Sequence, residues 1–235
     1  MTRPYTLAVF TKNRVNPGYA AARLAADRVA GEAGARTLHF VPTTPDDVAV
    51  GHTAAKALID GLGGQGRIVA IEGTPAAPTS RDRTVGLRTA LAETPAFTLL
   101  GSGVGYFQQA PARAEMARLL GEHDAIDGVW TSNDVMAFGA LESLAAAGRT
   151  AKVVGVNGLP EAIEHIERGT MQASVDFSAF NIAGIAAHAA LRHLRGEAVP
   201  PSIMVPAALI DRTNYERWKV PFAMRPTPAW EEIVA

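Results

Sequence analysis

The chain has 235 residues, of which 48% are hydrophobic, and its formal net charge at pH 7 is −1. This length can bury one large core or two small ones, and the composition is typical of an ordinary α/β protein. The near-neutral charge argues against a dedicated nucleic-acid binder, and the absence of cysteine excludes disulfides, thiolate catalysis and cysteine-ligated metals.

The first forty residues predict one βαβ unit. The expected order is a buried strand at 5–10, a helix at 18–34 and a second strand at 36–41. Asn16 is placed to cap the helix, and Pro17 occupies the first helical position, where its missing N–H costs nothing.

The chain then breaks the expected alternation. Residues 43–50 look like the opening of a helix, yet residues 51–62 form another helix with no strand between them. Gly51 would cost a fused helix about 1 kcal/mol. A lobe with only two strands would also leave its apolar residues exposed. We therefore predict that the Val50 carbonyl carbon and the Gly51 nitrogen are not bonded, and that further strands lie between them.

From residue 67 onward, strands and helices alternate regularly. The expected strands are 68–71, 97–100, 128–131, 151–156, 171–176 and 203–210. Between them lie predicted helices, one capped by Ser80, one opened by Pro111, one ended by Gly148 and one ended by Gly169. A last, long helix stops at Gly196. Repeated βα units predict an α/β fold with parallel sheets, whose ligands collect at the carboxyl ends of the strands.

The familiar catalytic motifs are absent. Residues 61–66 (GLGGQG) match a dinucleotide fingerprint by letter, but they precede a strand instead of following one, so they predict a turn. The six histidines share no metal-ligand spacing, and no acid–base pair stands out. We expect neither an enzyme nor a cofactor or metal site.

Hydrogen-bonding and aromatic residues do recur after the predicted strands. They are Asn16, Tyr19, Arg81, Phe107, Asn133 and Asn157. Amide and guanidinium groups that bond hydroxyls, beside aromatic faces that stack on C–H surfaces, suit a neutral polyhydroxylated ligand. Each residue also has a simpler interpretation, since Asn16 and Asn133 are good helix caps and Arg81 could be a solvated first-turn residue.

At these residues the chain resembles the type I periplasmic sugar-binding proteins of ABC transporters, the group that includes ribose-binding protein. The matching segments are 15–19 (VNPGY), 71–86, 129–139 (VWTSNDVMAFG), 154–158 (VGVNG) and 169–175. The resemblance implies that Asn16, Tyr19, Arg81, Phe107 and Asn133 contact the sugar. Two positions depart from the ribose-binding pattern: Asn157 replaces an aspartate, and Phe177 stands where a glutamine is usual. Both changes alter the hydroxyl pattern that the site would recognise.

The resemblance also implies an architecture. It predicts a two-lobed periplasmic-binding-protein-like fold, with parallel sheets, helices on both faces and ligand in the cleft. The expected first lobe is 1–50 plus 178–205, and the second is 51–177 plus 206–235. The family carries two further βα units after residue 50, roughly 50–60 residues. The family role predicts a monomeric solute-binding component that meets a membrane permease and no nucleic acid. The same role predicts a periplasmic or extracellular location, with the leader peptide removed.

Two other functions stay open. The effector-binding core of a LacI-type regulator shares the same lobes, but such regulators carry a helix-turn-helix, and here residue 5 already begins the sheet. An enzyme is the third choice, because no acid–base pair supports one.

Overall fold

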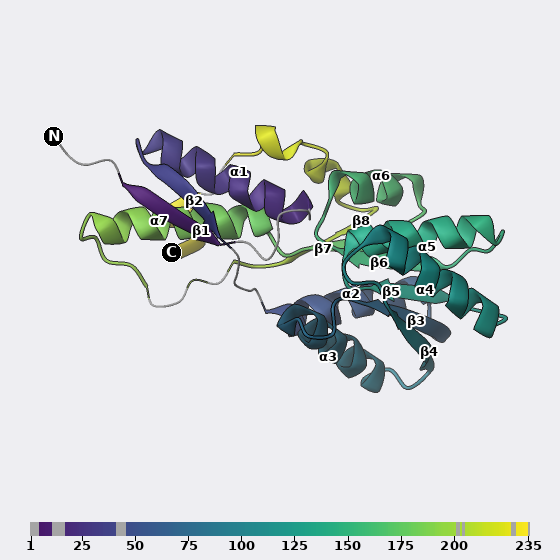
Figure 1. The fold of residues 1–235 in the computed structure, drawn as a ribbon. Helices are drawn as coiled ribbons and strands as arrows, with labels where there is room; N and C mark the ends of the chain where they lie inside the picture. The colour runs from purple at the N-terminus through teal and green to yellow at the C-terminus, as the bar shows by residue number, and fades with distance from the viewer. Residues whose placement is uncertain are drawn as a thin grey trace. The chain divides into compact units, whose positions relative to one another are not determined.

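A computed structural model describes residues 5–10, 17–40, 46–200, 203, 205–226 and 229–234, and the side chains at 10, 17–19, 38–40 and 234 lie outside this description. The chain forms two compact units (Figure 1). The first unit comprises Met1–Pro45, Phe177–Pro206 and Val220–Ala235, and the second comprises Asp46–Asp176 and Ala207–Lys219. No helix among the described residues is long and apolar enough to cross a membrane.

The first unit is a two-stranded parallel sheet covered by helices. Its elements are β1 (Thr6–Phe10), α1 (Pro17–Glu32), β2 (Arg36–Phe40), α7 (Ala179–Leu194), the 3-10 helix η2 (Phe222–Met224) and α8 (Trp230–Val234). Leu7 and Val9 of β1 are buried in one apolar cluster with residues of α1 and α7, whereas the alternate residue Ala8 is exposed. Because successive strand residues point to opposite faces, α1 and α7 cover the same face of β1.

The second unit contains a six-stranded sheet with the order β4-β3-β5-β6-β7-β8. The strands are β3 (Gly66–Glu72), β4 (Phe97–Val104), β5 (Gly128–Thr131), β6 (Lys152–Val156), β7 (Ala173–Asp176) and β8 (Ala208–Asp211). All neighbouring pairs are parallel except β7 and β8. The predicted α/β fold with parallel-dominated sheets is therefore confirmed.

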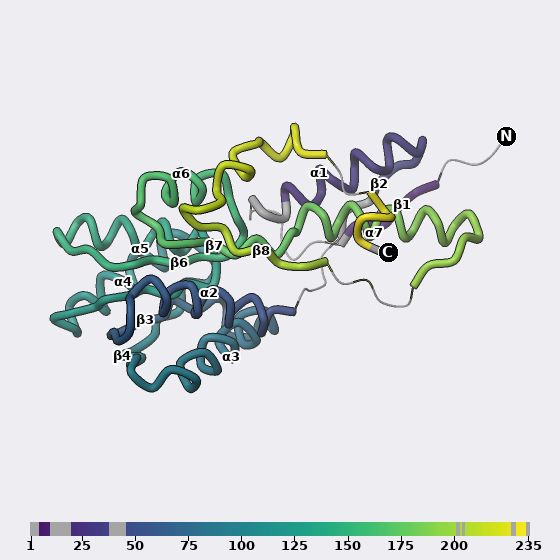
Figure 2. The backbone as a smooth tube through the Cα atoms, turned by 180° about the vertical axis from the view of Figure 1, so that it is seen from behind, coloured from purple at the N-terminus to yellow at the C-terminus, as the bar shows by residue number. Residues whose placement is uncertain are grey.

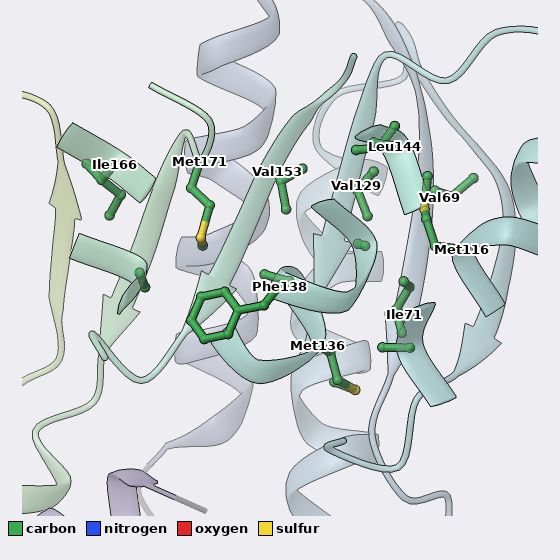
Figure 3. Packing of buried hydrophobic residues seen from close by; sticks show 14 of the residues in the cluster. Val69, Ile71, Met116, Val129, Met136, Phe138, Leu144, Val153, Ile166 and Met171 are labelled. Carbon is green, nitrogen blue, oxygen red and sulfur yellow. The ribbon is translucent and has the colours of Figure 1, made fainter. Parts of the chain in front are cut away.

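Helices cover both faces of this sheet. They are α2 (Asp47–Leu62), α3 (Pro78–Ala92), α4 (Gln109–Glu122), α5 (Asp134–Ala146) and α6 (Pro160–Arg168), followed by the 3-10 helix η1 (Tyr215–Trp218). In Figure 1 the helices α4 and α5 lie towards the viewer, and in Figure 2, from behind, α2 does. The core of the α4–α5 face is apolar: Val69, Ile71 and Val129 of the sheet lie beneath Met136 and Leu144 of α5 (Figure 3).

The predicted break between Val50 and Gly51 is wrong. Helix α2 runs through both residues without interruption, and the Val50 amide donates to the Asp46 carbonyl at 3.0 Å. The physical reason is a close helix crossing. A Cβ atom on Gly51 would lie 2.1 Å from the Arg83 carbonyl of α3, and one on Gly86 would lie 2.2 Å from the Val48 carbonyl of α2. Gly51 is thus required by packing against α3 and does not mark a chain end.

Three element boundaries also differ from the expectation by three residues or more. Helix α3 begins at Pro78 after Ala77, so Ser80 is a buried residue inside the helix and not its cap. Strand β4 continues to Val104, because it follows β3 along its whole length past an irregularity at Ile68/Val69. Strand β8 starts only at Ala208. By contrast, the predicted left-handed stop at Gly148 (φ 62°) is confirmed, and so is the alternative interpretation of Asn133 as a helix cap.

Besides the single residues Phe177 and Pro206, which belong to the first unit, the two units differ from the predicted lobes at two places. Residues 46–50 belong to the second unit, where Asp47 and Val50 are buried on α2. Residues 220–235 belong to the first unit, where the Phe222 ring stacks on Phe180 with centroids 6.1 Å apart.

Candidate functional site

Four of the predicted ligand residues lie at one edge of the second unit. Arg81 is in the first turns of α3 after β3, Phe107 follows β4, Asn133 follows β5 and Asn157 follows β6. The strands β4, β3, β5 and β6 are consecutive neighbours and parallel. Their carboxyl ends therefore form one continuous edge, the position where open α/β sheets bind ligands.

The Phe107 loop has an unusual backbone. Tyr106 and Phe107 both have positive φ angles, 53° and 60°, in a region that non-glycine residues rarely occupy. The Phe107 ring lies directly over Gly73, where a Cβ atom would come within 2.1 Å of the ring carbon Cζ. Strained residues of this kind persist only where surrounding contacts hold them, and they concentrate at ligand sites.

Asn133 has a clear structural role in this loop. Its side-chain oxygen accepts from the Met136 amide at 2.9 Å, and its Nδ2 donates to the Phe107 carbonyl at 3.4 Å. The side chain is buried, with 1% of its surface exposed. These contacts show that Asn133 caps α5, and its second hydrogen bond links α5 to the Phe107 loop.

Asn157 lies on a second strained turn. Its φ angle is 132°, and its amide donates to the Val175 carbonyl at 2.9 Å. A buried carboxylate beneath the turn fixes the residues that follow: the Leu159 amide donates to Asp134 at 2.9 Å, and the Ser174 hydroxyl donates to Asp134 at 2.7 Å. Ser174 in turn accepts from the Gly158 amide at 3.0 Å. The position of Asn157 therefore depends on a hydrogen-bonded network inside the unit.

The environment of Asp134 raises its pKa towards neutrality. Complete burial raises the pKa of this carboxyl to about 7, although the hydrogen bonds from Leu159 and Ser174 lower it. The carboxylate of Asp176 raises it further, and the guanidinium of Arg83 lowers it.

A second buried network holds the other half of the edge. Arg83 pairs with Asp47 of α2 at 2.8 Å and donates to the Ser132 carbonyl at 2.6 Å. Both side chains are nearly inaccessible to solvent. Arg83 thereby joins α2, α3 and the loop after β5, whereas Arg81 is exposed. Two residues apart on a helix is about 200°, so only one of these arginines can face the protein interior.

The remaining predicted residues belong to the first unit. Asn16 lies outside the described residues, and the side chain of Tyr19 on α1 does too. Phe177 is buried, with 4% of its surface exposed. Their ligand contacts stay predictions.

Sequence reasoning missed several residues that build this edge. They are Arg83, Ser174, Tyr106 and Trp218. Trp218 donates its indole N–H to Asp176 at the end of β7, at 3.0 Å, and Tyr106 is 51% exposed beside Phe107. The Arg-x-Arg spacing was a visible signal, but it does not say which of the two arginines turns inward.

Two curated proteins have sequences similar to this chain. The chain is 35% identical over 147 residues to the D-allose-binding periplasmic protein of Escherichia coli (strain K12), covering 61% of this chain and 47% of that protein. It is 29% identical over 183 residues to the ribose import binding protein RbsB of Bacillus subtilis (strain 168), covering 78% and 58%. The chain thus spans about half the length of the curated relatives it matches.

Solved structures share the fold. An ABC transporter periplasmic solute-binding protein from Actinobacillus succinogenes 130z, with bound D-allose, superposes with a TM-score of 0.85 at 19% identity, covering 92% of this chain and all of that one. A twin-arginine translocation pathway signal protein from Burkholderia phytofirmans gives a TM-score of 0.88 at 22% identity, covering 100% and 97%. A family model described as "Periplasmic binding protein domain" matches residues 25–198. Because that match covers well over half of the sequence, the chain belongs to the periplasmic binding protein domain family.

Proposed function

We propose that this protein is a solute-binding component of an ABC transporter and binds a monosaccharide or polyol. Relatives are named for D-allose, ribose and xylitol, and one structural neighbour holds bound myo-inositol. These names belong to transport proteins, which favours transport over the effector-binding core of a LacI-type regulator. They are also names of binding proteins, so we infer that the ligand is held without being turned over.

The observation that carries the proposal is the carboxyl edge of the second unit. It holds an exposed guanidinium at Arg81, an aromatic ring at Phe107 on a strained backbone, and an amide at Asn157 on a second strained turn. The ring can stack on the C–H face of a sugar, while guanidinium and amide groups bond neighbouring hydroxyls. Because Asn157 is neutral where the ribose-binding pattern has a carboxylate, it can donate to a hydroxyl as well as accept from one.

The location and the partner follow from the same proposal. Relatives are named as periplasmic, so we infer a periplasmic or extracellular protein that delivers its ligand to a membrane permease. Among its described residues the first unit has only two strands, so we expect weak binding. Binding measurements therefore need ligand concentrations up to about 10 mM, at which a binding free energy of only about 3 kcal/mol in magnitude can still be detected.

The test is titration calorimetry with D-allose, D-ribose, xylitol and myo-inositol on two matched variants. Arg81→Ala should weaken binding of the preferred ligand by about 2 kcal/mol, roughly 30-fold, because a charge-assisted hydrogen bond is lost. Arg88→Ala removes an exposed arginine farther along the same helix and should leave affinity unchanged. Binding of amino acids or nucleotides in place of every sugar and polyol would contradict the proposal.

A further inference from the structure

Among the described residues of its unit, the strand β1 has a partner on one edge only. Its only partner among the described residues is β2, in parallel register from Thr6↔Arg36 to Phe10↔Phe40. The Arg36 amide donates to the Tyr5 carbonyl at 2.9 Å. In a parallel ladder, alternate residues bond the same neighbour. Residues 5, 7 and 9 therefore direct their N–H and C=O groups towards β2, and residues 6, 8 and 10 direct theirs away from it.

This edge carries none of the usual protection against pairing. Edge strands are normally blunted by charges, proline, bulges or very short length. The sequence of β1, TLAVF, has no charged residue and no proline, and its register with β2 is regular. The other edges differ: β2 begins with Arg36, β4 has a register shift in its pairing with β3, and β8 has only four residues and ends with Asp211.

A two-stranded sheet also has less pairing than a stable sheet needs. Sheets usually contain four to six strands. The chain spans about half the length of its curated relatives, and the continuous helix α2 leaves no strand between β2 and the second unit among the described residues. The strand that would complete β1 must therefore come from outside the described residues of this chain.

We propose that β1 pairs antiparallel with β1 of a second copy of this chain, giving a four-stranded sheet with the order β2-β1-β1-β2. The pairing is self-complementary about a two-fold axis at Ala8. Residue 8 then lies opposite residue 8 of the second copy, and residue 6 opposite residue 10, so the outward N–H and C=O groups bond each other. Ala8 is exposed and small, so its side chain fits beside its own copy.

The apolar residues of both copies support this register. With Ala8 on the axis, Leu7 of one copy lies opposite Val9 of the other, on the face that α1 and α7 cover. The two buried clusters then become continuous across the axis. Helix α7, which packs on β1, also carries apolar residues outside its buried cluster: Ala186 is exposed, and Ile182 and Ala189 are half-buried at helical spacing. The dimer replaces the monomer that the family resemblance implies.

A single cysteine tests the geometry, because the chain has none of its own. Directly opposed residues in a hydrogen-bonded antiparallel pair have Cα atoms about 5.5 Å apart, within disulfide range. Ala8→Cys should give a covalent dimer on mild oxidation. Ala110→Cys, at an exposed position on α4, is the matched control and should stay monomeric. Equal cross-linking of both variants, or none in Ala8→Cys, would overturn the proposal.

Light scattering after size exclusion gives the second measurement. The wild type should have twice the 24.7 kDa mass of one chain at a concentration of about 100 μM, a range in which weak dimers are populated. Ala8→Pro removes the outward N–H and leaves the β1–β2 ladder in place, so this variant should be monomeric. Ala8→Lys keeps the N–H but places two like charges at the axis, and should weaken dimerisation about fivefold or more. Circular dichroism spectra equal to the wild type show that either variant is folded. A monomeric wild type, or folded Ala8→Pro and Ala8→Lys variants that dimerise as the wild type does, refutes β1 pairing.

Discussion

The buried carboxyl of Asp134 makes the stability of the second unit dependent on pH. Its pKa is raised to about 7 by burial, above the ordinary value of 3.8. The native state therefore holds the proton more tightly than the unfolded chain does. The stability gained from this proton is fully present below about pH 4 and is lost as pH rises through about 7. Asp134→Asn carries no titrating proton, so it should lack this dependence.

The size of the effect follows from linkage. Between the two pKa values the free energy of unfolding falls by about 1.4 kcal/mol per pH unit. Over the range from pH 5 to pH 8 the loss is about 2.5 kcal/mol, because the slope fades above pH 7. The free energy of unfolding of Asp134→Asn, relative to that of the wild type, should therefore rise by about 2.5 kcal/mol between pH 5 and pH 8, whatever its value at pH 5. Other groups titrate in both proteins, and their contributions cancel.

Urea unfolding at 25 °C, monitored by tryptophan fluorescence, measures this difference. Trp130 is fully buried in the second unit, and Trp218 belongs to it as well. Trp230 belongs to the first unit, so both proteins should carry Trp230→Phe. A difference between variant and wild type that changes by less than about 0.5 kcal/mol between pH 5 and pH 8 would show that Asp134 is not the proton-holding group.

Four further substitutions test the helix crossing, with its control on α1, and the strained edge. Gly51→Ala should destabilise the second unit by about 3 kcal/mol, because the new Cβ would lie 2.1 Å from a carbonyl oxygen of α3. Gly31→Ala, whose new Cβ would meet open space, should instead stabilise α1 by about 0.5–1 kcal/mol. Urea unfolding of each variant measures these changes. Asn157→Gly should relieve the strain at φ 132° and stabilise the protein by about 1 kcal/mol while weakening ligand binding in calorimetry, and equal affinity would remove Asn157 from the site. Gly73→Ala should displace the Phe107 ring and weaken ligand binding more than it lowers the melting temperature, and unchanged affinity would contradict a ligand contact by that ring.

The local signals in the sequence were sufficient for much of the fold. Asn133 before α5 and glycine at the left-handed stop, Gly148, are caps whose chemistry acts within a few residues; the stop was predicted, and the cap was the alternative considered for Asn133. Alternation of apolar strands and amphipathic helices likewise predicted the parallel sheet of the second unit. These features depend on short stretches of chain, which a single sequence displays in full.

The failures have a different physical origin. The identity of Gly51 reflects a helix crossing with α3, some thirty residues later in the chain, and not a local break. Arg83 and Arg81 share one motif, yet only the packing of α3 decides that Arg83 turns inward to Asp47. Interactions between residues far apart in sequence leave no periodic signal, so they could not be predicted from the residues alone.

The order of the chain through the two units has a consequence for folding. Five parallel strands of the second unit come from one uninterrupted stretch, Asp46–Asp176, so only β8 arrives late. In the first unit, β1 and α1 need α7, which follows them by well over one hundred residues. Closing so long a loop is slow compared with pairing neighbouring strands. During refolding, amide hydrogens of β3, β5 and β6 should therefore become protected from exchange before those of β1, and the reverse order would show that the first unit nucleates folding.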